Sequence, residues 1–564
     1  MVAWKVAVAF AGIVVFGGCG SKNPVLNNAA PVFTSGVSHS RNVAVDSSVI
    51  DTIVAVDPEG GSITYTLASG PAGMTMVDGV ISWIPGAGDT GIKVANIVAR
   101  DVQGDSSRIS VVYLVGSFRF KDVYLAAEEI KEEVEFFRGK AFLRNVAVVV
   151  KTRSQYAADR FSTGSSGNDL SDAEKMLGNK VLIAEGFLRQ GDDYWGETDS
   201  MLAVGVGGFY VPGSDSLWVI VADSDTVIDT NTRVSLFHEF VHALQDQYYS
   251  LNLLESRITS SDQAYALRYV IEGEAGYLDW FYGIKLYEGA YPSSSDRVLW
   301  GLRQYEQDIN QALENFHDAG ERFFVYQPLI WAYTYGPEFV GSVVGNMDWS
   351  LIDTRLFARL PVRTREVLEP AVYWAGNRTG FVVRMDSVME VVSRDGLVLD
   401  YDEYGSVHTS VLLREWGEPN WYSISLKLVS DRIVAWGDSA GDSVSLCWYT
   451  HWIDKPSRDI FIGAYRNVMS AKYGSPVADL GLSGNEWVMD DMANRCYLES
   501  KGNDVYVLER YRTGTKDKLI DAARSARVLN WGVLGKISAD NTKIYGRVKK
   551  DRKEPGCHGK QPIL

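Results

Sequence analysis

The stretch that decides the fold is SLFHEFVHAL, residues 235–244, in which two histidines flank a glutamate in an HExxH pattern. The stretch has no charged residue outside this pattern, which predicts a helix buried on most of its sides. At about 100° per residue, His238 and His242 lie about 40° apart on one helical face, separated by one turn. Two imidazole nitrogens at this spacing can converge on one metal ion.

Glu239 lies on the flank of the same helix, about 100° from His238. There it can reach a water molecule beside the metal rather than the metal itself, which is where a general base must be. The chain has only 7 histidines in 564 residues, so an accidental HExxH is expected roughly 0.005 times per chain of this length. The residues alone leave one alternative open, a helix whose two histidines have structural partners.

A catalytic zinc site needs a third protein ligand and an open fourth position. The stretch ALRYVIEGEAG, residues 266–276, predicts a second helix with two carboxylates, Glu272 and Glu274. They lie about 200° apart on a helix, so only one of them can face the metal. The helix geometry alone does not decide which of the two glutamates is the metal ligand.

Several segments resemble, in order, the pattern of a group of bacterial secreted or lipoprotein zinc metallopeptidases of the gluzincin type. These segments are 134–139 (VEFFRG), 208–210 (GFY), 238–247 (HEFVHALQDQ), 272–275 (EGEA), 335–340 (YGPEFV), 361–370 (PVRTREVLEP), 431–433 (DRI) and 446–452 (LCWYTHW). The resemblance spans about residues 120–510. One departure is Leu368-Glu369-Pro370, where the group often has His before Pro.

The resemblance implies one zinc ion on His238, His242 and Glu272, with Glu239 as the general base. In gluzincins the third ligand begins a Glu-Gly-x-Ala string, which favours Glu272 over Glu274. It also implies a protein or peptide substrate, whose sequence it does not name.

Several further residues are candidates for supporting roles around the metal. Asp246, four residues after His242, and Asp279, seven after Glu272, share helical faces with ligands and are candidates to orient an imidazole. Glu274 is the remaining candidate of this kind. By analogy with some gluzincins, Tyr335 or Tyr210 would donate to the oxyanion.

The expected fold class is α+β: an N-terminal β-sandwich followed by a zincin-like domain with a helical catalytic half and a β-rich C-terminal half. The expected parts are a signal peptide (1–19), a tether (20–30), an immunoglobulin- or cadherin-like sandwich (31–117), the catalytic region (118–375), its C-terminal α+β part (376–513) and a basic tail (514–564).

The N-terminus predicts export. Lys5 precedes an apolar run of 11 residues, Val6 to Phe16, which is too short to span a bilayer about 30 Å thick. The following Gly-Gly-Cys resembles a bacterial lipobox, which implies lipidation of Cys19 and anchoring to the cell envelope, on the outer membrane or the cell surface. An ordinary secretory signal or an uncleaved anchor is the alternative.

The segment 31–117 alternates short strands with Gly, Pro and Asp turns, which predicts a β-sandwich. It resembles the immunoglobulin- or cadherin-like repeats of bacterial surface proteins. Asp57, Glu59 and Asp101 are candidate calcium ligands, although carboxylates in such turns mostly cap their own backbone.

Four cysteines occur, at positions 19, 447, 496 and 557, so a cysteine-based zinc site is excluded. In an oxidising compartment, Cys447 and Cys496 are the candidate disulfide pair.

The net charge of −16 opposes binding to nucleic acid. The tail from residue 514 is the exception, with a net charge of +7, and is expected to be solvated.

The function expected is a membrane-anchored zinc metallopeptidase. The alternative is a non-catalytic envelope protein that uses the same fold for binding. An intact Glu239 favours the peptidase, because binding alone does not need a general base.

Overall fold

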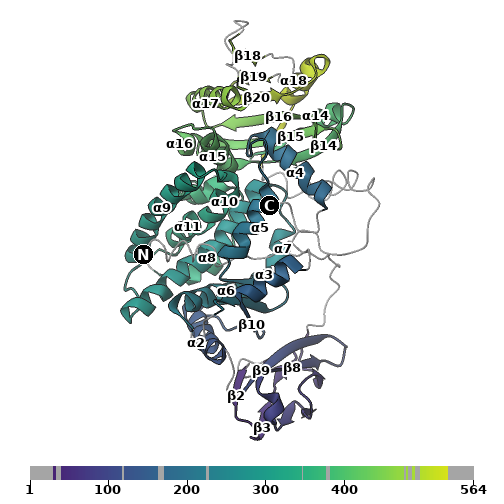
Figure 1. The fold of residues 1–564 in the computed structure, drawn as a ribbon, viewed down its shortest axis with the longest axis vertical. Helices are drawn as coiled ribbons and strands as arrows, with labels where there is room; N and C mark the ends of the chain where they lie inside the picture. Colours follow the sequence, from purple (N-terminus) through teal and green to yellow (C-terminus); the bar gives the residue numbers. More distant parts are fainter. Residues whose placement is uncertain are drawn as a thin grey trace.

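The computed structural model describes residues 30–33, 40–116, 120–162, 171–223, 228–345, 347–376, 381–474, 478–479, 486–489 and 496–530. The fold is α+β, as predicted: an N-terminal β-rich region, a central helical region and a C-terminal antiparallel sheet (Figure 1). Cys19, the tether up to residue 29 and the tail from residue 531 lie outside the described residues. None of the helices in the described part has both the length and the apolar character needed to cross a membrane.

The N-terminal region is a sandwich of two sheets, at the bottom of Figure 1. One sheet has the order β2 (Ser40–Val43), β9 (Ser106–Val115), β8 (Gly91–Arg100), β5 (Thr64–Ser69), and the other β3 (Val49–Thr52), β7 (Val80–Trp83), β6 (Thr75–Val77). Strands β1 (Val32–Phe33) and β4 (Ala55–Val56) form a further pair. Alternate side chains such as Ile81, Trp83 and Ile97 face inward and form a core of their own.

Two of the three carboxylates considered for calcium, those of Asp57 and Asp101, cap turns of this sandwich. Asp57 Oδ1 accepts a hydrogen bond of 2.7 Å from the Glu59 N–H. Asp101 Oδ1 accepts from the N–H groups of Gln103, Gly104 and Asp105. Both side chains therefore stabilise the conformation of their own loops.

The sandwich packs directly on the central region through the outer face of β9. Val112 and Leu114 of that strand pack with Tyr124 of α2 (Lys121–Arg138) and with Val148 and Val150 of β10 (Ala147–Thr152). This apolar contact holds the sandwich against the domain that follows it.

A three-stranded sheet and two long helices form the base of the central region. The sheet has the order β10, β12 (Ser216–Val221), β11 (Gly208–Val211), with β12 parallel to β10 and antiparallel to β11. Helix α6 (Thr230–Tyr249) contains the HExxH and begins where the Asp229 carboxylate accepts a hydrogen bond from the Thr232 N–H. Helix α8 (Ser261–Glu288) is capped in the same way by Ser260 and contains the EGEA string.

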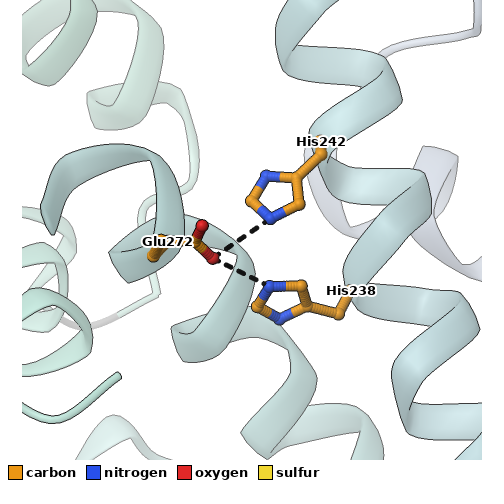
Figure 2. A group of neighbouring side chains, drawn as sticks. All are labelled: His238, His242 and Glu272. Carbon is orange, nitrogen blue, oxygen red and sulfur yellow. Dashed lines mark hydrogen bonds and ion pairs between the residues drawn. The ribbon is translucent and has the colours of Figure 1, made fainter. Parts of the chain in front are cut away.

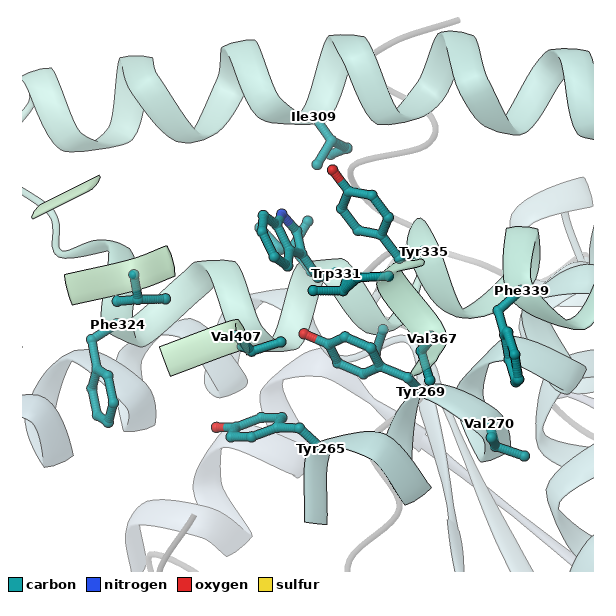
Figure 3. Close-up of a cluster of buried hydrophobic side chains, with 14 of the residues drawn as sticks. Tyr265, Tyr269, Val270, Ile309, Phe324, Trp331, Tyr335, Phe339, Val367 and Val407 are labelled. Atoms are coloured by element: carbon teal, nitrogen blue, oxygen red, sulfur yellow. The ribbon is translucent and has the colours of Figure 1, made fainter. Parts of the chain in front are cut away.

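The other helices of this region are α3 (Arg153–Ser162), α4 (Asp172–Glu185), α5 (Tyr194–Gly205), α7 (Leu251–Glu255), α9 (Ser295–Asp318), α10 (Phe323–Ala332), α11 (Tyr335–Val344), α12 (Thr364–Leu368) and α13 (Pro370–Trp374). Aromatic residues of α8 and α10, among them Tyr265, Tyr269 and Trp331, pack against Val407 of α15 (Gly405–Glu415) in the main core (Figure 3).

Helix α11 crosses α8 at a contact between two glycines. A Cβ on Gly273 would lie 2.5 Å from the backbone of Gly336, and one on Gly336 would lie 2.5 Å from the Tyr269 carbonyl oxygen. The EGEA and YGPEFV segments therefore meet in space, and the glycine between the two glutamates is needed for this close approach.

The C-terminal part is a seven-stranded sheet in the order β14 (Leu397–Asp402), β15 (Leu428–Gly437), β16 (Val444–Trp452), β20 (Asp504–Glu509), β19 (Cys496–Lys501), β18 (Glu486–Met489), β17 (Ala478–Asp479). The helices of this part are α14 (Asp386–Val392), α15, α16 (Trp421–Ser425), α17 (Lys455–Tyr473) and α18 (Lys516–Arg524). Strand β13 (Phe381–Arg384) pairs with β21 (Arg527–Asn530).

The helical and the β-rich parts of the chain share one hydrophobic core, which contains residues from Val123 to Val507. Leu519, Ile520 and Ala523 of α18 are buried in the C-terminal core, so this part continues past residue 513 to Asn530. The apolar face of α18 is the physical reason that these residues are not a solvated tail.

The suggested disulfide between Cys447 and Cys496 is wrong, because the two buried side chains belong to different cores. Cys447 lies on β16 opposite Leu508, and Cys496 lies on β19 opposite Glu509, so β20 runs between them. Neighbouring residues of β20 point to opposite faces, and the two sulfurs accordingly belong to different cores. Burial raises the pKa of the Cys447 thiol to about 12.

Candidate metal centre

His238, His242 and Glu272 come together between helices α6 and α8 (Figure 2). Their potential ligand atoms all lie within 4.8 Å of one another. Glu272 Oε2 lies 3.2 Å from the Nε2 atoms of both His238 and His242. These three buried residues form a group that could hold a metal ion, and the two nitrogens and one oxygen are donors that zinc accepts.

Electrostatics at this group favour positive charge at its centre. Burial alone would raise the pKa of Glu272, but the two imidazoles outweigh it and lower that pKa to about 2. Burial alone would lower the pKa of His238, but the hydrogen bonds that its ring donates to the carboxylates of Asp279 and Glu272 raise it to about 10. A centre that stabilises a cation in a buried position fits a divalent metal. Apart from its approach to Glu272 Oε2 at 3.2 Å, His242 Nε2 has no hydrogen-bond partner among the described residues, which leaves it available as a ligand.

Asp279 orients the first imidazole. Its Oδ2 lies 2.9 Å from His238 Nδ1, which directs Nε2 toward Glu272. The carboxylate therefore holds the ring in the tautomer and the orientation that a ligand needs. This is the arrangement that the seven-residue spacing from Glu272 suggested.

Gln245 orients the second imidazole, a role that the sequence did not assign. Its Oε1 lies 2.9 Å from His242 Nδ1, and its Nε2 donates to the Ile271 carbonyl and to Glu274 Oε2, each at 2.9 Å. Glu274 also forms a fully buried ion pair with Arg138 of α2. Glu274 thus faces away from the metal group and supports His242 through Gln245.

Asp246 does not orient an imidazole, in contrast to the expectation. Its Oδ2 accepts hydrogen bonds from the Tyr210 hydroxyl at 2.9 Å and from the Gly213 N–H at 2.7 Å, and its Oδ1 accepts from the Leu251 N–H at 2.9 Å. The carboxylate instead joins the end of α6 to the turn after β11.

The two tyrosines expected near the oxyanion have other surroundings. The Tyr210 hydroxyl is held by Asp246. Tyr335 stacks on Tyr422, with ring centroids 5.9 Å apart, and points toward Ile309 of α9 in Figure 3.

Tyr333, at the end of α10, lies beside the metal group instead. Its ring centroid is 5.9 Å from that of His238. Burial raises the pKa of its hydroxyl well above the ordinary value, and the charges of Glu272 and Glu239 add to this shift. The hydroxyl therefore keeps its proton at neutral pH and can donate it in a hydrogen bond. The sequence carries no signal for this residue, because 29 tyrosines occur in the chain.

Glu239 is fully buried on the flank of α6. Neither of its carboxylate oxygens has a hydrogen-bond partner of good geometry among the described residues. Burial raises its pKa well above the ordinary value for a carboxyl group, and the His238 charge only partly opposes this. A Cβ on Gly208 of β11 would lie 3.3 Å from Glu239 Cγ, so the glycine allows this strand to pass directly over the carboxylate.

The role of Asp279 can be tested by Asp279→Asn, which we expect to weaken the affinity for a divalent metal by about 10- to 100-fold. The amide cannot supply the negative charge that holds His238 Nδ1. Competition with a metal chelator measures the affinity. Asp246→Asn is the matched control, because Asp246 is an equally buried carboxylate at the end of α6 that contacts no ligand. Wild-type affinity in Asp279→Asn would contradict this role.

Comparison with known proteins yields little. No family model matches the chain, and no curated protein matches it. Among solved structures, an endo-fucoidan hydrolase of glycoside hydrolase family 107 matches at 23% identity with a TM-score of 0.14, over 18% of this chain and 15% of that one. A nucleoside hydrolase-related protein from Saccharophagus degradans, associated with carbohydrate metabolism, matches at 20% identity with a TM-score of 0.14, over 16% of this chain and 26% of that one. The chain thus spans about a quarter or less of the length of these two proteins.

Proposed function

We propose that this protein is a zinc-dependent peptidase of the cell envelope. The observation that carries the proposal is the convergence of His238, His242 and Glu272 next to Glu239, a buried carboxylate whose oxygens have no hydrogen-bond partner of good geometry among the described residues. Two imidazoles and one carboxylate leave a fourth position for the reacting groups, as catalytic zinc sites require. A purely structural zinc site has four protein ligands and no need of an unpaired carboxylate beside it.

Zinc held by these three residues would act as a Lewis acid toward a water molecule and the peptide carbonyl. Glu239 would take the proton from the attacking water and deliver it to the leaving amine. Burial raises the pKa of Glu239 above the ordinary value for a carboxyl group, which favours the transfer of a proton to it. The Tyr333 hydroxyl would donate a hydrogen bond to the carbonyl oxygen as negative charge develops on it.

The orientation of the two imidazoles supports this proposal. Asp279 holds His238 and Gln245 holds His242, so both Nε2 atoms are directed before a metal binds. Such outer partners fix the ligand geometry and the basicity of the imidazoles. The experiment that tests the function is hydrolysis of a diverse peptide library by the zinc-loaded protein, compared with the Glu239→Gln variant.

The location in the envelope is tested by Cys19→Ser. Because lipid on Cys19 would be the anchor, we expect the variant to leave the membrane fraction and the wild-type N-terminus to carry the mass of acyl groups. Cell fractionation and mass spectrometry of the mature protein measure both. Equal membrane retention of the variant, with no acyl mass on the wild type, would contradict a lipid anchor.

A further inference from the structure

Arg268 stands one helical turn before Glu272 on α8, on the same face of the helix. The ligand residues are buried, but Arg268 and Tyr333 are each only half-buried. In the other direction along this face, Ala275, Gly276 and Asp279 are all buried. The side of the metal group that Arg268 and Tyr333 mark is therefore its more open side.

Among the described residues, the guanidinium of Arg268 lacks the carboxylate partner that a half-buried arginine usually has. Its only ring contact in the described structure is with Tyr265, 5.9 Å from the centroid. Across the described residues, no carboxylate oxygen lies within 4.0 Å of a side-chain nitrogen of Arg268, the limit for an ion pair. Two other arginines of the central region, the buried Arg138 and the half-buried Arg322, are both paired with carboxylates.

The positive charge of Arg268 affects the pKa values of ionisable groups around it. Its charge lowers the pKa of Tyr333, opposing the effects of Glu272 and Glu239. It also opposes the effect of burial on Glu255, whose pKa is raised to about 7. The positive charge of Arg268 thus acts on Tyr333, which lies beside the proposed reaction centre, as well as on Glu255.

We propose that Arg268 binds a carboxylate of the substrate, beside the bond that is cleaved. The inference rests on the proposed peptidase function and adds the class of its substrates, which are peptides with a negative charge close to that bond. The planar guanidinium fork matches a carboxylate with two parallel hydrogen bonds, a geometry that an ammonium group does not offer. The carboxylate comes from the C-terminus of a peptide or from an Asp or Glu side chain.

The test is calorimetric binding to the zinc-loaded, full-length Glu239→Gln protein, in which peptides are not consumed. Three probes are compared: acetyl-Ala-Phe-Ala with a free C-terminus, the same peptide as its C-terminal amide, and acetyl-Ala-Phe-Asp amide. We expect at least one carboxylate probe to bind about tenfold or more tightly than the uncharged amide. Which of the two does so identifies the source of the carboxylate.

The added substitution Arg268→Gln should remove this preference and leave binding of the uncharged amide unchanged. Arg268→Lys, which keeps the charge and loses the fork, should retain part of it and serves if the glutamine variant does not fold. Arg257→Gln, which removes an exposed arginine before α8, is the matched control and should keep the full preference. Zinc content is measured for every variant.

Equal binding of all three probes, binding of none of them, or a preference that survives Arg268→Gln would each overturn the inference. The proposed function can fail separately. If the carboxylate preference depends on Arg268 but the wild-type protein hydrolyses no peptide, the binding inference stands and the peptidase proposal falls.

Discussion

Glu239→Gln is expected to keep zinc bound and to lower peptide hydrolysis by about 10²- to 10⁴-fold, the usual contribution of general acid and base catalysis. The substitution preserves the size of the side chain and removes the proton acceptor. Because Glu239 lies on the flank of α6 and outside the group of three ligands, the metal should be unaffected. Turnover of peptides and zinc content per chain are the two measurements.

The same variant separates the peptidase from a non-catalytic envelope protein that uses the fold for binding. A binding protein should not respond to one amide in place of a buried carboxylate. Glu338→Gln is a suitable control, because Glu338 is a half-buried glutamate of α11 outside the metal group, and it should retain full turnover. A wild-type protein that holds zinc and hydrolyses no peptide would favour the binding protein.

Glu272→Gln and Glu274→Gln are expected to have opposite effects on metal and stability. Glu272→Gln removes a ligand and should lose most of the zinc, a larger effect than the 10- to 100-fold typical for an outer partner of a ligand. Glu274→Gln should keep much of the zinc but leave the buried Arg138 with only the more exposed carboxylate of Asp353 as an ion-pair partner among the described residues. Loss of one partner of a buried ion pair costs on the order of 3 kcal/mol of stability.

Elemental analysis and denaturant unfolding measure these two effects. The two variants carry the same chemical change at sites two residues apart, so each is the control for the other. If Glu274→Gln lost the zinc and Glu272→Gln kept it, the assignment of the third ligand would be reversed.

The central features of the site could be predicted from the sequence because they follow from helix geometry. The HExxH places His238 and His242 on one face, and the opposed directions of Glu272 and Glu274 meant that one of them had to face away. The structure directs Glu272 to the histidines and Glu274 to Arg138. Asp279 follows from the same periodicity, seven residues after Glu272.

Features that depend on tertiary contacts could not be read in this way. Gln245 and Asp246 are neighbours on α6, and only the positions of α8 and β11 decide which of them reaches an imidazole. Tyr333 approaches His238 from the end of another helix. The sequence offers Cys447 and Cys496 as a candidate disulfide pair, but the register of β16, β20 and β19 places them on opposite faces of the sheet.

Zinc binding by His238, His242 and Glu272 is tested by anomalous X-ray scattering at the zinc edge from crystals of the zinc-supplemented protein. We expect one peak per chain, about 2.0 to 2.2 Å from the Nε2 atoms of both histidines and from a carboxylate oxygen of Glu272. No peak between these three side chains, or a peak bound by other residues, would contradict it.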